Sequence, residues 1–284
     1  MSRAISHATW VVLLACLNTT LASAEEVRSL KFLKGGKEVA QLTLAELMTK
    51  ATPQQLEVFE FQNGEKRTYD VIPFNAVMDA AYGKDWRKSE DILFTCLDGY
   101  QPIVPVSEFT KHPAFLAIAV RGAKDFTVFS KIHQNTTVDL GPFYLVWKNI
   151  GDAVLMAQGP NWWPYQLTTV DLVRFADKSA KLAPPAGAKP DAKEGFALFR
   201  KTCLACHTLN GEGGQAAGVE LNRPVNVTKY WKKEWLAKWI ASPKSLREST
   251  KMPDYGSESG YKLPADVQAK QIQQIIAYLE SMAK

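Results

Sequence analysis

The stretch Cys203-Leu204-Ala205-Cys206-His207 constrains the fold more strongly than any other part of the sequence. Two thiols on one helical turn can form thioether bonds with the two vinyl groups at one edge of a porphyrin, and the adjacent imidazole can then bind the iron. A thioredoxin-type redox pair does not need the histidine, and a zinc site would need a second cysteine pair, which this sequence lacks. The motif therefore predicts one covalent haem c, tethered by Cys203 and Cys206, with His207 as an axial ligand.

A second axial ligand is expected further along the chain. Met252, followed by Pro253, supplies a soft thioether, a ligand that favours reduced iron. Methionine is more often a core residue, but the one nearby competitor is Met282, since the other mature methionines lie far upstream. We therefore expect Met252 to be the second axial ligand of the haem iron.

Three helices are expected around this motif. Residues 191–203 and 233–240 have amphipathic helical spacing, and 265–282 form a long apolar-faced segment. Glycine-rich loops such as 211–214 separate them. The C-terminal segment, 191–284, is therefore expected to be an all-α domain.

Residues 191–284 resemble a class I c-type cytochrome domain. The resemblance rests on the attachment motif, on Met252-Pro253 and on the pattern Ile275-Ile276-Ala277-Tyr278-Leu279. It implies that the first and last helices cross tightly, with Gly195-Phe196 against Tyr278. The family often has Gly-Pro-x-Leu after the motif, where this sequence reads Gly218-Val219-Glu220-Leu221. A carbonyl from Val219 can still orient the histidine, although the rigidity of the proline is lost.

The preceding region, residues 25–177, has the pattern of a mixed α+β domain. Strands are expected at 56–61, 92–96, 114–120 and 143–147, and helices at 44–50 and 73–82. The two types of element are interleaved, but without a regular βαβ rhythm.

This region resembles the molybdopterin-binding domain of the sulfite-oxidase type. The segments that carry the resemblance are 69–74, 98–100 with 104–106, 141–146, and 163–166 with 170–173. The family's molybdenum-ligand cysteine is missing, since no cysteine stands between Ala24 and Cys96, and Tyr144 stands where the family usually has an arginine. We therefore expect no molybdopterin here, and a scaffold or partner-recognition role instead.

Five other side chains in this region could each have a structural or a functional role. Cys96 fits a small buried core residue better than a ligand. His112 and His133 are isolated histidines, which are more often surface or core residues than metal ligands. Trp162-Trp163 could form a docking platform or, more in keeping with such pairs, a packed aromatic corner.

The N-terminus has the pattern of a secretory signal peptide. Arg3 precedes the apolar run 8–17, and Ala22-Ser23-Ala24 gives a small-residue cleavage site. We expect residues 1–24 to be removed after Ala24 and the protein to be exported to the periplasm. A buried helix and a lipid anchor at Cys16 are alternatives, and the apolar run is shorter than the ~20 residues that a membrane span needs.

Residues 178–190 are rich in proline, alanine and lysine, and we expect them to be an interdomain linker.

The net charge is +5, and the excess of basic over acidic residues lies in the C-terminal third of the chain. Seven basic residues between Lys229 and Lys251 precede the expected methionine ligand. They form either a solvated helix face or a surface that steers acidic redox partners. Nothing in the sequence indicates nucleic-acid binding.

Together these patterns predict a two-domain periplasmic protein with one haem that transfers electrons between redox partners, its N-terminal domain serving as a docking module. The alternatives are a haem-containing oxidoreductase subunit of a sulfite-oxidase-like molybdenum system and a haem-based ligand sensor. We expect a carrier of electrons rather than an enzyme that converts a substrate.

Overall fold

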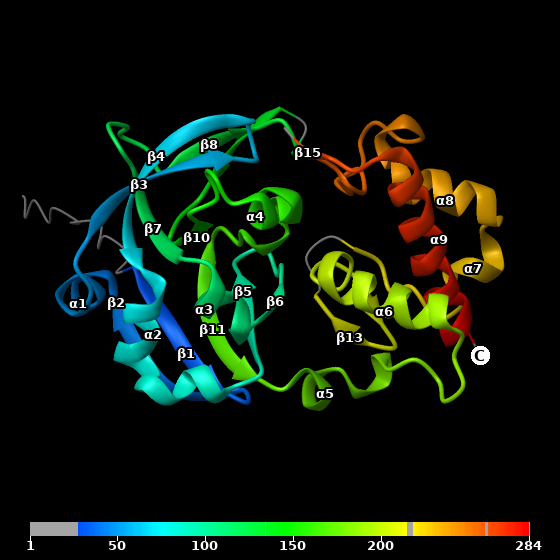
Figure 1. Ribbon diagram of the computed structural model, residues 1–284, viewed down its shortest axis with the longest axis horizontal. Coiled ribbons are helices and arrows are strands. Elements are labelled where there is room, and N and C mark those ends of the chain that lie inside the picture. Colours follow the sequence, from blue (N-terminus) through cyan, green and yellow to red (C-terminus); the bar gives the residue numbers. More distant parts are fainter. Residues whose placement is uncertain (1–27, 134, 215–217, 259–260, 284) are drawn as a thin grey trace, which may run out of the picture.

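The computed structural model describes residues 28–133, 135–214, 218–258 and 261–283. The predicted signal peptide and Cys16 lie outside these residues. The chain forms a sheet-rich N-terminal domain and a helical C-terminal domain that lie side by side (Figure 1). Of the helices that the structure describes, none is both long and apolar enough to cross a membrane.

The N-terminal domain is built on two sheets. The first has the order β2-β1-β11-β5-β6, and the second β10-β7-β4-β3. The pair β1/β11 is parallel, and the other pairs within these two sheets are antiparallel. The strands span β1 Ser29–Lys34, β2 Lys37–Thr43, β3 Gln54–Glu60, β4 Glu65–Pro73, β5 Asp91–Cys96, β6 Ile103–Pro105, β7 Ala114–Val120, β10 Tyr144–Trp147 and β11 Leu167–Val173, and a separate hairpin joins β8 Thr127–Ser130 to β9 Thr136–Asp139.

Short helices connect these strands. They are α1 Leu44–Lys50, α2 Phe74–Tyr82, α3 Val106–Lys111 and α4 Ala153–Gln158, with 3₁₀ turns at Lys84–Lys88 and Gly159–Trp162. α1 begins with a capping box, because Thr43 accepts from the amide of Glu46 while the Glu46 carboxylate accepts from the amide of Thr43. The predicted elements at 44–50, 73–82, 92–96, 114–120 and 143–147 are confirmed to within a residue at each end, and the one at 56–61 to within two.

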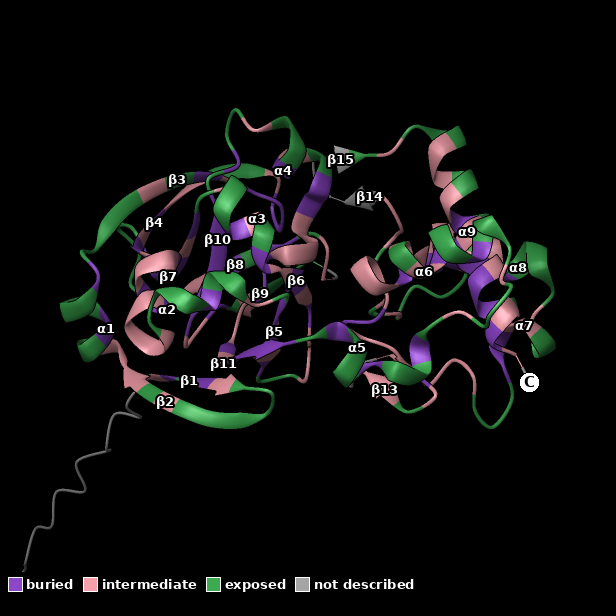
Figure 2. Ribbon diagram, turned by 60° about the horizontal axis from the view of Figure 1, so that its bottom comes forward, coloured by how far each residue is buried: buried purple, intermediate pink, exposed green. Residues whose placement is uncertain are grey.

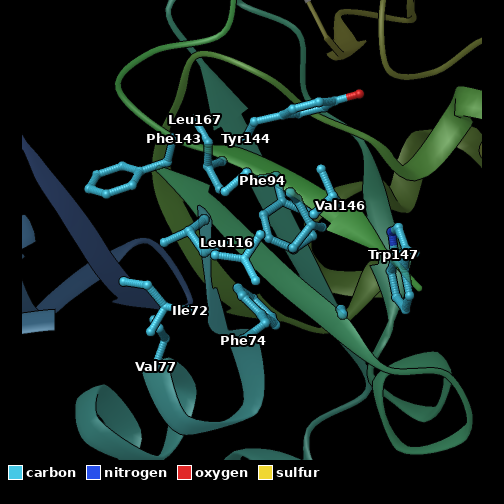
Figure 3. Packing of buried hydrophobic residues seen from close by; sticks show 14 of the residues in the cluster. Ile72, Phe74, Val77, Phe94, Leu116, Phe143, Tyr144, Val146, Trp147 and Leu167 are labelled. Atoms are coloured by element: carbon cyan, nitrogen blue, oxygen red, sulfur yellow. The ribbon is translucent and has the colours of Figure 1, made fainter. Parts of the chain in front are cut away.

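Aromatic and branched side chains fill the core of this domain (Figure 3). Phe74 at the start of α2 lies 5.8 Å from Phe94 of β5, and Trp147 of β10 lies 4.8 Å from Phe109, measured between ring centres. The central strands β5 and β11 are mostly buried, whereas the edge strand β2 is mostly exposed (Figure 2). Strands β5 and β11 therefore lie inside the domain, and β5 ends at Cys96, close to the second domain.

The C-terminal domain is formed by α6 Pro190–Thr202, α7 Val227–Tyr230, α8 Lys233–Ala241 and α9 Ala265–Met282, with a 3₁₀ turn at Pro243–Ser245 and two-residue strands at Thr208–Leu209, Glu212–Gly213, Ser257–Glu258 and Tyr261–Lys262. The expected crossing of the first and last helices is confirmed. Gly195 of α6 lies against α9 so closely that a Cβ atom there would be 1.8 Å from the carbonyl oxygen of Gln274. Phe196 and Phe199 flank the crossing, with ring centres 5.3 and 5.2 Å from that of Tyr278.

The predicted linker takes part in the core of the C-terminal domain. The structure has α5 at Phe175–Lys178 and a 3₁₀ turn at Ala180–Leu182. Leu182 is fully buried, Phe175 belongs to the same apolar cluster, and the Tyr278 hydroxyl donates to the Leu182 carbonyl at 2.6 Å. The predicted linker therefore contributes one side chain, Leu182, to the core of the C-terminal domain, where it packs against a distant helix.

Several polar contacts join the two domains. Arg200 of α6 makes an ion pair with Asp91 of β5 at 2.6 Å, and its guanidinium lies 4.0 Å from the ring centre of Phe175. The amide of Gln101 donates to the carbonyl of Ala205, between the two cysteines of the motif, at 3.0 Å. The N-terminal domain thus contacts the turn that carries the haem motif.

Candidate functional site

The turn that follows α6 carries the three side chains of the haem motif. The amides of Cys206 and His207 both donate to the carbonyl of Cys203, at 3.2 and 2.9 Å. This geometry keeps both thiols and the imidazole within one turn, as the spacing predicts. All three residues line the same cavity.

The loop after the motif fixes the orientation of His207. Its Nδ1 lies 2.9 Å from the carbonyl oxygen of Val219. Because a carbonyl can only accept, Nδ1 donates, and Nε2 keeps the lone pair that a metal ligand needs. Gly218 permits this contact, since a Cβ there would be 2.7 Å from Nδ1 of the ring. The carbonyl expected from Val219 is therefore in place although the family's proline is absent.

Burial sets the ionisation of the three groups. It lowers the pKa of His207, and the hydrogen bond to Val219 opposes that effect. It raises the pKa of Cys203 to about 11 and that of Cys206 to about 12, with the charges of Asp98 and Cys203 adding to the effect at Cys206. A catalytic thiol–disulfide pair has a lowered thiol pKa. These two cysteines have the opposite environment, and the neutral imidazole is the form that binds a metal.

The cavity has a volume of about 590 Å³, within the usual range of roughly 300–1,000 Å³ for cofactor sites. Helices α6, α8 and α9 supply mainly apolar walls, which include Leu198, Phe199, Leu236, Ile240, Ile275 and Leu279. An apolar cavity with two thiols and one imidazole on one side fits a largely apolar macrocycle that is attached at one edge.

Met252 lines this cavity together with His207. Its side chain is half-buried and packs against the core of the C-terminal domain. The alternative, Met282, is buried in the same core at the end of α9 and does not line the cavity among the residues that the structure describes. The structure therefore brings Cys203, Cys206, His207 and Met252 together around one cavity, although they were identified independently in the sequence.

Elsewhere in the described parts of the chain, the histidines have ordinary structural partners. Nδ1 of His112 lies 2.6 Å from a carboxylate oxygen of Asp152. Nδ1 of His133 lies 2.9 Å from the Ser130 hydroxyl and 3.2 Å from the Gln62 side-chain oxygen. No group of three or more His, Cys, Asp or Glu side chains suited to a metal ion occurs among the described residues.

Cys96 and the tryptophan pair lie near the domain boundary. Cys96 is a free, buried thiol at the end of β5, and burial holds its pKa well above the usual value. Trp163 is buried, with its ring centre 5.5 Å from that of Phe61, so it is part of a packed aromatic corner. Trp162 lies beside it, and the Lys201 ammonium of the C-terminal domain is 5.7 Å from its ring centre.

A buried carboxylate in the N-terminal domain was not singled out from the sequence. Glu60, at the end of β3, is fully buried and accepts hydrogen bonds from the Tyr69 hydroxyl at 2.6 Å and the Tyr144 hydroxyl at 3.1 Å. Burial raises its pKa, and the hydrogen bonds only partly oppose this. Tyr144 of β10 thus serves this buried network.

The sequence also gave no sign that the N-terminal domain reaches the cavity. Residues 157–161, at the end of α4 and in the following 3₁₀ turn, line it opposite the C-terminal domain. Nothing in their composition distinguishes them from an ordinary loop. Their place at the cavity depends on how the two domains pack, which no local pattern encodes.

The comparison with protein families agrees with this geometry. Residues 192–283 match the family model described as cytochrome c. The match covers the C-terminal domain and includes the motif, the cavity helices α6, α8 and α9, and Met252. Members of this family carry covalently bound haem. The C-terminal part of the chain is therefore a cytochrome c domain with a haem-based role in electron transfer.

Proposed function

We propose that the protein is an exported electron carrier with a single haem c, bound through Cys203 and Cys206 and ligated by His207 and Met252. One observation carries this proposal: the four side chains, from two separate segments, meet at one apolar cavity. When bound, the haem supplies an iron that accepts and releases one electron. The protein's residues tether it, orient the imidazole through Val219, and exclude water with apolar walls.

Two axial side chains would leave no open position on the iron for a substrate or a gas. This separates an electron carrier from the alternative of a haem-based ligand sensor. The proposed export to the periplasm rests on the predicted signal peptide. We propose that the mature chain begins after Ala24.

The first experiment measures the attached group. The protein is expressed with a haem-attachment system and its mass is determined after denaturation and after extraction with acidified organic solvent. We expect the added mass of one haem to stay with the chain. The Cys203→Ala/Cys206→Ala double variant should lose the haem on extraction. A haem that is extracted from the unaltered protein would refute the proposed tether.

We further propose that acidic redox partners dock at a basic rim of the cavity, defined as Lys229, Lys232, Lys238, Arg247 and Lys251. All five are exposed, and Arg247 and Lys251 line the cavity itself. Lys244, from the same stretch, instead donates to the carbonyl of Ile132 in the N-terminal domain at 2.8 Å. Exposed aromatic groups, Tyr230 and Trp235, lie in the same segment.

Charge steering can be measured with small redox reagents. Oxidation by anionic ferricyanide should slow as ionic strength rises, whereas reduction by a cationic ruthenium hexaammine should speed up. Replacing Arg247 and Lys251 by glutamate should weaken or reverse both trends, while the same change at Lys31 and Lys37, which lie on the N-terminal strands, should not. Rates that do not depend on ionic strength with either reagent would contradict the steering role.

For the N-terminal domain, we propose a fold of the sulfite-oxidase type that holds no molybdopterin and contributes to partner docking. The support is the two-sheet architecture, the motifs on β4, β10 and β11, and the missing ligand cysteine. A fragment that starts at Arg174 keeps Phe175 and Leu182 of the C-terminal core. If this fragment accepts electrons from a periplasmic extract as fast as the whole chain does, the docking role is refuted. Stoichiometric molybdenum in the purified protein would instead establish the oxidoreductase alternative.

A further inference from the structure

The segment that leads to Met252 contacts the N-terminal domain. Lys244, in the 3₁₀ turn after α8, donates through its ammonium to the carbonyl of Ile132 at 2.8 Å. Ile132 lies in the loop between β8 and β9. A hydrogen bond from a charged donor is stronger than one between neutral groups. This contact therefore ties the N-terminal domain to the stretch of chain that ends at the proposed axial ligand.

The loop around Ile132 is itself held by hydrogen bonds. The amide of Lys131 donates to the carbonyl of Gln62 at 2.7 Å, and the amide of His133 donates to the hydroxyl of Ser130 at 2.9 Å. The Ser130 hydroxyl in turn donates to the side-chain oxygen of Gln62 at 2.6 Å. The carbonyl of Ile132 is thus a fixed point of the N-terminal domain.

Hydrogen bonds also connect the turn at Lys244 with Met252. The amide of Arg247 donates to the carbonyl of Pro243 at 2.9 Å, and the amide of Thr250 donates to the carbonyl of Arg247 at 3.1 Å. The amide of Met252 donates to the Thr250 hydroxyl at 3.2 Å. After the turn, the chain described by the structure forms no helix or strand up to Met252. These bonds and the Lys244 contact therefore carry much of the positioning of the segment.

A second observation places this segment against the N-terminal domain. Burial, and after it the positive charges of Lys244 and Lys251, lower the pKa of His133. Lys251 immediately precedes Met252 and lines the haem cavity. Both ends of the segment therefore lie near the loop that carries His133.

We propose that Lys244 is a positioning residue for the second axial ligand, and that the N-terminal domain, through Ile132, keeps the Met252 thioether on the haem iron. This inference rests on the proposed ligation of the iron by Met252. The contact restricts a segment without regular structure, so the state in which the thioether has left the iron is less populated. The N-terminal domain thereby helps to keep the second axial position closed.

Cyanide is the probe, because it can bind ferric iron only while Met252 is off the iron. Cyanide is added to the full-length ferric holoprotein and to its Lys244→Met variant, and binding is followed by visible absorption. While the rate is proportional to the cyanide concentration, it reports the fraction of molecules with the thioether displaced. A hydrogen bond to a charged group changes an equilibrium roughly tenfold, so the variant should bind cyanide about tenfold faster.

Two further variants separate the contact from the charge. Lys270→Met removes a positive charge from an exposed position of α9 and should bind cyanide as slowly as the unaltered protein. Lys244→Arg keeps a charged donor for the Ile132 carbonyl and should retain most of the slow rate. The far-red band of methionine ligation should be weaker in Lys244→Met than in either of these variants.

A Lys244→Met rate equal to that of the unaltered protein overturns the inference, and so does an equal rise in Lys270→Met. If Lys244→Met does not fold, Lys244→Gln gives the same measurement. It lacks the charge and should bind cyanide faster than Lys244→Arg, and equal rates in these two variants again overturn the inference. Failure of the proposed function shows in the unaltered protein alone. Cyanide binding there as fast as in Met252→Ala would refute the methionine ligand and this inference with it.

Discussion

Alanine at Gly195 should destabilise the C-terminal domain, even though alanine favours helix formation. The new Cβ would lie 1.8 Å from the carbonyl oxygen of Gln274 and 2.4 Å from its carbonyl carbon. Carbon–oxygen contacts are normally about 3.3 Å or longer. Helices α6 and α9 would therefore have to separate by ~1.5 Å at their crossing, the difference between these distances.

The size of the effect follows from three contributions. Forcing an extra methyl group into a packed core costs about 1–3 kcal/mol, and a backbone obstacle that cannot rotate away places this case at the upper end. Separation also weakens the contacts of Phe196 and Phe199 with Tyr278, each worth about 0.5–1.5 kcal/mol. Alanine regains about 1 kcal/mol of helix propensity. We therefore expect the free energy of unfolding to fall by about 3 kcal/mol.

Urea unfolding of the full chain, followed through the haem absorption, measures the free energy of unfolding of the C-terminal domain. The control is Ala197→Gly, at an exposed position in the same helix. It should lower the free energy of unfolding by only about 1 kcal/mol, which is the difference in helix propensity between alanine and glycine. A Gly195→Ala protein that is as stable as the unaltered one, or more stable, would refute the close crossing and with it the assignment of the helical domain.

Three further predictions concern other parts of the molecule. Arg200→Met leaves the carboxylate of Asp91, whose side chain is 2% exposed, buried without its partner, and should cost about 3–5 kcal/mol in urea unfolding. The double variant with Asp91→Asn should recover most of that loss, and equal losses in both would argue against a buried interdomain ion pair. Burial raises the pKa of Glu60, so its contribution to stability is complete below the unfolded-state pKa of about 4.3 and is lost as pH rises through the folded-state pKa. Between pH 4 and 9, the urea unfolding midpoint of the Glu60→Gln variant should fall less with rising pH than that of the unaltered protein. An equal fall in both proteins would contradict the buried environment of Glu60. Gly218→Ala places a Cβ 2.7 Å from the motif imidazole and should reduce the low-spin fraction in visible spectra, whereas Val219→Ala keeps the orienting carbonyl and should not. Equal spectra for these two variants would mean that the loop does not orient the imidazole.

Local patterns in the sequence identified part of the elements and the chemical groups of the haem motif. The spacing of the haem motif, the apolar face of residues 265–282 and the alternation at 114–120 each depend on neighbours in the chain. They predicted α9 and β7 with the boundaries that the structure has. Met252 could be chosen because few methionines compete with it, and the cavity that it shares with His207 agrees with that choice.

Contacts between distant segments were beyond these patterns. Leu182 looks like an isolated leucine in a linker, yet it is buried under Tyr278 of the last helix. Gln158 ends a short helix in one domain and lines a cavity in the other. Glu60 alternates with apolar neighbours like any surface position of a strand, and only the two tyrosines that reach it from β4 and β10 reveal its burial. Each depends on packing between segments that are far apart in the sequence.

Visible absorption spectra of the full-length holoprotein, oxidised and then reduced, with carbon monoxide added to the reduced form, test the central claim most directly. If His207 and Met252 both bind the iron, the bands will be sharp and low-spin, the oxidised form will show the weak far-red band of methionine ligation, and carbon monoxide will leave the spectrum unchanged. A Met252→Ala variant should lose the far-red band and bind carbon monoxide. A high-spin spectrum of the unaltered protein, or ready carbon monoxide binding, would contradict the electron-carrier account and favour a haem with an open coordination position.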